Sequence, residues 1–143
     1  MIAVDTNILV YAHRVDSSWN DTAWPLLQTL AKSRATWAIP WPCIHEFLCV
    51  VTHARIYAPA TTMEDALHQV TAWLESPKVT LLAENELHWP SLRTQLSTAK
   101  VTGAMVHDAR IAALCLSHGI TEFWTADRDF SRFPELKCRN PLL

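Results

Sequence analysis

The most informative stretch of the chain is Ile-Ala-Val-Asp-Thr-Asn-Ile-Leu-Val-Tyr-Ala at residues 2–12. Its first three residues are apolar and are followed directly by a carboxylate, Asp5. Apolar residues then resume from Ile8, with enough length for a helix. The stretch therefore predicts a buried strand that ends at a carboxylate and passes into a helix.

The rest of the chain continues this alternation of short strands and helices. Further strands are predicted at residues 36–39, 79–82, 120–125 and 136–139. Helices are predicted at residues 19–32, 43–52, 63–74, 85–98 and 104–117, where apolar residues tend to recur every three or four positions. Pro25 is expected in the first turns of its helix, where a missing amide is tolerated, and residues 126–134 are expected to form a polar loop. The pattern predicts an α/β fold, a three-layer α/β/α sandwich with a central, mainly parallel sheet.

Length and composition predict one folded domain over residues 1–143. Of the 143 residues, 50% are hydrophobic and 18% are charged, which suffices for one substantial core. The longest apolar runs are too short to span a bilayer, and no basic leader precedes them, so we expect a cytoplasmic protein with no membrane partner. The four cysteines lack C-x-x-C spacing and are expected to be reduced thiols.

Four acidic residues occupy positions where a charge is costly. Asp5 and Asp127 each follow a predicted strand, and the carboxyl ends of parallel strands form the ligand-binding edge of such sheets. Glu46 and Asp108 share their predicted helix faces with apolar residues. A buried carboxylate must be paired, protonated or bound to a metal, and several that meet repel one another. A divalent cation removes that penalty.

Oxygen-only ligation by carboxylates suits the hard ions Mg²⁺ and Mn²⁺. Such ions orient and activate water and neutralise charge on a reacting phosphate. The set of carboxylates therefore favours metal-dependent phosphodiester cleavage. The formal net charge of −2 gives no general attraction for nucleic acid, but cations bound at an acidic cluster leave the remaining surface close to neutral or basic.

The motifs around these carboxylates resemble those of one family. They are the opening Asp-Thr-Asn, the lone Glu46, His-Asp-Ala-Arg-Ile-Ala at 107–112 and Trp-Thr-Ala-Asp-Arg-Asp-Phe at 124–130. In this order, and over essentially the whole chain, they look like the PIN-domain nucleases, especially the VapC toxins of toxin–antitoxin pairs. The resemblance implies a PIN-like fold and a metal-dependent endoribonuclease that cleaves RNA and inhibits translation. It also implies a cognate antitoxin and a homodimer.

The resemblance assigns roles to individual residues. It implies a catalytic and metal-binding set with supporting polar side chains: Asp5, Glu46, Asp108 and Asp127 bind Mg²⁺ or Mn²⁺, supported by Thr6, Asn7 and Thr125. Asp129 competes with Asp127, because in an extended segment their side chains point to opposite sides and at most one is a direct ligand. Asp127 is preferred because it lies nearer the strand end, with Asp129 in a supporting role. The candidate RNA contacts are Arg110, Arg128 and Arg132.

Other functions stay open at this point. His45, Cys49 and His53 recur every four residues on a predicted helix and offer transition-metal ligands, although no second cluster completes the shell. A PIN-domain nuclease that processes RNA without an antitoxin also fits the carboxylates, and so does a non-catalytic domain that binds RNA or protein. Nucleophilic catalysis is less plausible, because Cys115 lies on an apolar helix stripe and no G-x-S-x-G motif is present.

The chain has seven tryptophans. Such residues usually fill a core, but they also serve apolar interfaces. The sequence leaves both roles open for four of them: Trp19, Trp24, Trp37 and Trp41.

Overall fold

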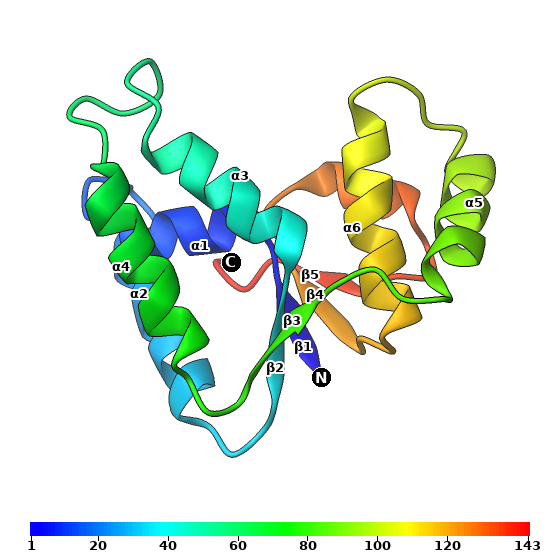
Figure 1. Cartoon of the computed structure of the whole chain (residues 1–143), viewed down its shortest axis with the longest axis horizontal. Helices are drawn as coiled ribbons and strands as arrows, with labels where there is room; N and C mark the ends of the chain where they lie inside the picture. Colours follow the sequence, from blue (N-terminus) through cyan, green and yellow to red (C-terminus); the bar gives the residue numbers. More distant parts are fainter.

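A five-stranded, fully parallel sheet forms the centre of the computed structural model, which describes residues 1–143 (Figure 1). The strands are β1 (Ile2–Val4), β2 (Trp37–Pro40), β3 (Val79–Leu82), β4 (Glu122–Trp124) and β5 (Cys138–Arg139). Their order across the sheet is β3-β2-β1-β4-β5.

Helices cover both faces of this sheet. They are α1 (Thr6–His13), α2 (Asn20–Lys32), α3 (Trp41–Val51), α4 (Met63–Leu74), α5 (His88–Ala99), α6 (Met105–Ser117) and the 3₁₀-helix η1 (Arg128–Arg132). In Figure 1, α1 to α4 lie to one side of the strands and α5 and α6 to the other. Helix α1 packs against α2 and α3, and α5 packs against α6. The predicted three-layer α/β/α sandwich is confirmed.

The central strands are apolar because helices cover them on both sides. All four residues of β2 are buried, and Ala3 and Val4 of β1 are fully buried. Strands enclosed in this way need apolar side chains on both faces, so they show no alternation with polar residues. None of the helices is both long and apolar enough to cross a membrane, and all four cysteines are free thiols.

The order of the strands reverses beside β1. The chain runs outward from β1 through β2 to β3 and then returns to place β4 on the opposite side of β1, with Val4 paired to Trp124. Open α/β sheets bind their ligands at such a switch point, beyond the carboxyl ends of the strands. Asp5 follows β1 and Thr125 follows β4, so both residues lie at this point.

Two local predictions are wrong in detail. Pro25 is the sixth residue of α2, beyond the first turn, so it removes the hydrogen bond that its amide would otherwise donate to the Asp21 carbonyl. The segment predicted as a polar loop contains η1, because Phe130 and Phe133 are buried there and pack with each other. Phe130 also packs edge-on against Phe123 of β4, which holds the segment after β4 close to the sheet.

Candidate active site

Asp5 is the N-cap of α1 and is only 4% exposed. Its Oδ1 accepts hydrogen bonds from the amide of Thr6 (2.8 Å) and the thiol of Cys43 (3.6 Å). Its Oδ2 accepts from the side-chain amide of Asn7 (3.1 Å) and the hydroxyl of Thr125 (2.7 Å). Each carboxylate oxygen therefore has two donors, and the orientation of the side chain is fixed.

Thr125 and Asn7 connect this carboxylate to the segment after β4. The Thr125 hydroxyl accepts a hydrogen bond from the backbone amide of Asp127 (3.0 Å). The side-chain oxygen of Asn7 accepts one from the backbone amide of Ala126 (3.1 Å). The start of α1 therefore sets where the Asp127 segment lies relative to Asp5.

The four predicted carboxylates meet in one cavity. A cavity of about 300 Å³ is lined by Asp5, Glu46, Asp108 and Asp127, together with Thr6 and Asn7. Glu46 comes from α3 and is held by the Thr6 hydroxyl, which donates to its Oε2 (2.8 Å). Asp108 lies in the first turn of α6. Four separate parts of the chain thus bring one acidic side chain each to the same place.

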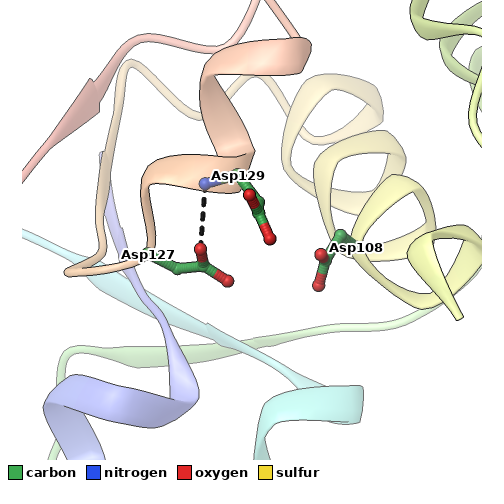
Figure 2. A group of neighbouring side chains, drawn as sticks. All are labelled: Asp108, Asp127 and Asp129. Atoms are coloured by element: carbon green, nitrogen blue, oxygen red, sulfur yellow. Dashed lines mark hydrogen bonds between the residues drawn. The ribbon is translucent and has the colours of Figure 1, made fainter.

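Asp127 and Asp129 belong to the same acidic cluster, so they are not alternatives for one ligand position. Carboxylate oxygens of Asp108, Asp127 and Asp129 all lie within 4.8 Å of one another, and Figure 2 shows the three side chains around a common space between η1 and α6. The backbone amide of Asp129 donates to Oδ1 of Asp127 (2.9 Å). The expectation of opposite orientations is wrong because the chain turns into η1 after Asp127 and is not extended.

Burial and mutual repulsion make ionisation costly at this site. Burial raises the pKa of Asp5 to about 6, with a further contribution from the negative charge of Glu46, although its hydrogen bonds act in the opposite direction. Burial also raises the pKa of Asp108 to about 6, and the carboxylates of Asp127, Glu46 and Asp129 add to the effect.

The donor set fits a hard divalent cation. The ion pairs of the structure are Arg14–Asp16, Arg110–Glu84, Lys137–Glu122 and Arg139–Glu122, and none involves the acidic cavity. Several carboxylates that share a cavity without a basic partner need another source of positive charge. Their oxygens are the ligands that Mg²⁺ and Mn²⁺ prefer.

The three arginines proposed to contact RNA differ in their surroundings. Arg110 is paired with Glu84 at 2.9 Å. Arg128 lines a second hollow of about 210 Å³, which shares Asp127 with the acidic cavity. Arg132 is exposed at the end of η1. Of the three, only Arg128 lines a hollow that shares a residue with the acidic cavity.

The alternative transition-metal site does not form. Helix α3 ends at Val51, so His53 lies beyond it, and its Nδ1 accepts a hydrogen bond from the backbone amide of Arg55 (3.1 Å). The only His, Cys, Asp and Glu side chains that converge as metal ligands are the three aspartates. The nucleophile alternative also fails for Cys115, because burial raises the pKa of this thiol well above its usual value.

Sequence reasoning missed the thiol of Cys43 and the apolar wall of the cavity. That wall is formed by Val10, Tyr11, Val50, Tyr57 and Phe130. Helical spacing could have identified part of it, because Tyr11 and Val50 lie four residues after Asn7 and Glu46 on the same helices. No sequence signal points to Tyr57, which lies outside the helices and strands.

The chain is similar in sequence to known proteins over nearly its whole length. The PIN domain family matches residues 2–136. The chain is 36% identical over 142 residues to the VapC ribonuclease Mb2897 of Mycobacterium bovis, covering 99% of this chain and 96% of that protein. It is 30% identical to the ribonuclease VapC48 of Mycobacterium tuberculosis, covering 96% and 94%.

Solved structures share the fold at lower sequence identity. VapBC-1 from nontypeable Haemophilus influenzae has a TM-score of 0.68 at 20% identity and covers all of both chains. VapC20 of Mycobacterium tuberculosis, described as a toxin that cleaves the sarcin-ricin loop, has a TM-score of 0.65 at 16% identity and covers 92% of this chain and 93% of its own.

Proposed function

The chain belongs to the PIN domain family, and on this premise we propose that it is a metal-dependent endoribonuclease acting as the toxin of a toxin–antitoxin pair. Relatives that are 36% and 30% identical over nearly the whole chain are named VapC ribonucleases. One observation carries the proposal. Four carboxylates from separate elements line a single cavity that contains no basic side chain.

In the proposed mechanism, Asp108, Asp127 and Asp129 would hold Mg²⁺ or Mn²⁺ together with Glu46, and Asp5 would contribute its negative charge beside them. A divalent ion held there would supply Lewis acidity and positive charge for hydrolysis of a phosphodiester. Glu46 binds the Thr6 hydroxyl through Oε2 and has no hydrogen-bond partner at Oε1. That oxygen is available to accept a proton from the attacking water.

Asp5 has a different part in this mechanism. Its two oxygens already accept four hydrogen bonds, which is about the full capacity of a carboxylate. Its negative charge therefore acts on the cavity from a fixed position. Thr6, Asn7 and Thr125 keep it there and align the segment that carries Asp127.

Replacement of one carboxylate by its amide tests the proposal. Asp108→Asn keeps the shape of the side chain but removes a charge, so we expect Mn²⁺-dependent cleavage of total RNA to fall by about 100-fold or more. Asp21→Asn is the matched control, because Asp21 is exposed in the first turn of α2 and lies outside the cavity. Cleavage that survives both EDTA and Asp108→Asn would contradict the metal-dependent proposal. Absence of cleavage by the wild-type protein in Mn²⁺ would instead favour the non-catalytic domain.

Arg128 is proposed to contact the RNA backbone, with smaller contributions from Arg132 and Arg110. We expect Arg128→Glu to weaken RNA binding while metal affinity is unchanged, and to reduce the dependence of binding on salt concentration. Arg34→Glu is the matched control, since Arg34 is exposed in the turn before β2. Equal RNA affinity of the two variants across a salt series would count against this role.

A cognate antitoxin, a homodimer and a cytoplasmic location complete the proposal. Solved structures that share this fold include VapBC2 from Rickettsia felis and VapBC-1 from nontypeable Haemophilus influenzae, which supports an antitoxin partner. Of the four tryptophans considered from the sequence, three have exposed area for apolar contacts, at 37%, 54% and 37%: Trp19, Trp24 and Trp41. Trp37 is fully buried and belongs to the core. A small gene directly upstream that encodes a DNA-binding protein would support the antitoxin. Its absence would favour an RNA-processing nuclease.

A further inference from the structure

Both tyrosines of the chain line the acidic cavity. Tyr11 lies on α1 one turn after Asn7, and Val10 lies one turn after Thr6. Because residues four apart share a helix face, α1 presents two polar side chains to the cavity at its start. It presents two apolar ones a turn later.

Helix α3 repeats this arrangement. Glu46 and Val50 are four residues apart and both line the cavity, and Tyr57 joins its wall from the segment that follows α3. Four residues advance about 6 Å along a helix, slightly more than one turn. The cavity therefore has an acidic part and, about one helical turn away, a part lined by valine and tyrosine. That separation is comparable to the reach from a phosphate across its ribose to the base.

Neighbouring side chains hold the Tyr57 ring in place. The guanidinium of Arg14 lies over the ring, 4.3 Å from its centroid. Arg14 is fixed in turn by Asp16, through bonds of 2.9 and 2.6 Å, and by the hydroxyl of Thr61 (3.2 Å). Arg14 thus covers one face of a half-buried ring that also lines the cavity. An aromatic ring fixed in this way loses little side-chain freedom when a ligand binds.

We propose that Tyr57, with Tyr11 lining the same wall, stacks against the nucleobase next to the scissile phosphate. The inference rests on the proposed ribonuclease function. A cavity of about 300 Å³ is at the small end of ligand pockets and suits one nucleotide. Every base has a π-face that can stack on an aromatic ring. In an RNA duplex that face is covered by neighbouring base pairs, whereas unpaired bases are free to turn outward.

A binding assay tests this inference separately from catalysis. The Asp108→Asn protein is used as the common background, so that the RNA stays intact. The probe is a short fluorescein-labelled oligouridylate, and its affinity is measured by fluorescence anisotropy. Adding Tyr57→Leu should lower this affinity on the order of tenfold, the loss typical for one stacked base, and Tyr11→Leu should lower it in the same direction. Tyr57→Phe should stay within about twofold of the background, because the ring is retained.

Matched controls separate stacking from a folding defect. Trp89→Leu removes an aromatic side chain that is 64% exposed on α5, away from the cavity, and should leave the affinity unchanged. On the same oligomer without bases, Tyr57→Leu and the background should bind equally. A folding defect would lower the affinity for both probes.

The assay has results that overturn the inference. The first is an equal oligouridylate affinity of the Tyr57→Leu and Tyr57→Phe proteins. The second is an equal loss of affinity from Tyr57→Leu when the probe is a fully paired RNA duplex. Failure of the proposed function would give a different result, because the wild-type protein would then not cleave RNA in Mn²⁺. The effect of Tyr57→Leu on oligouridylate affinity could still be measured in the Asp108→Asn background.

Discussion

Thr125 is the side chain through which β1, α1 and the Asp127 segment are connected. It is buried, it donates to Asp5, and it accepts from the amide of Asp127. Thr125→Val keeps the shape but leaves these groups without a partner, so we expect a loss of about 1–3 kcal/mol in the free energy of unfolding. RNA cleavage should fall by about tenfold or more. Denaturant unfolding and initial rates measure both effects.

Thr125→Ser is the control for that substitution, because it retains the hydroxyl. It should recover most of the cleavage rate. If Thr125→Val cleaves as fast as Thr125→Ser, the hydroxyl does not position the site.

Asp108 makes stability depend on pH in the metal-free protein. Its pKa is raised from 3.8 to about 6, so the folded state binds the proton more tightly than the unfolded state. Its contribution is therefore most favourable below pH 3.8 and is lost as the pH rises through 6. Asp108→Asn removes this penalty, and in EDTA at pH 7.5 it should raise Tm by about 2–4 °C.

This shift in Tm corresponds to about 1 kcal/mol, because solvent screening reduces the larger energy that a fully buried carboxyl would carry. The gain should shrink as the pH falls toward 4. A gain in Tm that is the same at pH 4 and pH 7.5 would show that the charge of Asp108 is not its cause.

The sequence identifies the individual carboxylates better than it identifies their neighbours. Asp5, Glu46 and Asp108 are recognisable because each is an isolated charge in an apolar stretch, and burial makes such a charge costly. Asp129 could not be assigned, because its direction depends on a turn of η1 that is set by the packing of Phe130. Tyr57 reaches the cavity only through tertiary contacts such as that with Arg14.

Helix α2 contains an internal proline, and its replacement should stabilise the protein. Pro25 is its sixth residue and leaves the Asp21 carbonyl without its helical donor. Pro25→Ala restores the amide, but it also makes the unfolded chain more flexible, so we expect a net gain of about 1 kcal/mol in the free energy of unfolding. The denaturant midpoint should rise while the slope m is unchanged.

The exposed residue Thr22 supplies the control for α2, because Thr22→Ala in the first turn changes helix propensity without restoring a hydrogen bond. Its gain should be only a few tenths of a kcal/mol. Equal midpoints for the two variants would mean that the helix adjusts to proline without cost.

Elements with a strong apolar pattern are predictable from sequence, and their boundaries are less so. The strands at β2 and β3 and the helices α4 and α6 follow from runs and spacings of apolar residues. Helix α1 begins at Thr6, two residues before its apolar run, because Asp5 caps it. Helix η1 was missed because its five residues include only one apolar side chain, Phe130.

For the molecule as a whole, a bound divalent ion should stabilise the fold. An ion that binds only the folded state adds about 2.7 kcal/mol when its concentration is 100 times its Kd. We therefore expect saturating Mn²⁺ to raise Tm by several degrees at pH 7.5. The effect should weaken below pH 6, where Asp5 and Asp108 become protonated.

The same titration with the Asp108→Asn protein provides the comparison. Its response to Mn²⁺ should be much smaller, whereas Asp21→Asn should respond like the wild type. An equal rise in Tm for all three proteins would place the stabilising ion outside the acidic cavity.

The position of β1 between β2 and β4 also sets when the site can first exist. Asp5 and Thr125 are 120 residues apart in the chain, and a protein is synthesised from its N-terminus. On the ribosome, β1 can pair with β2 early, but its other edge stays open until β4 has emerged. A nascent chain therefore lacks the complete set of carboxylates until the segment that carries Asp127 has emerged, so the site is assembled only at the end of synthesis.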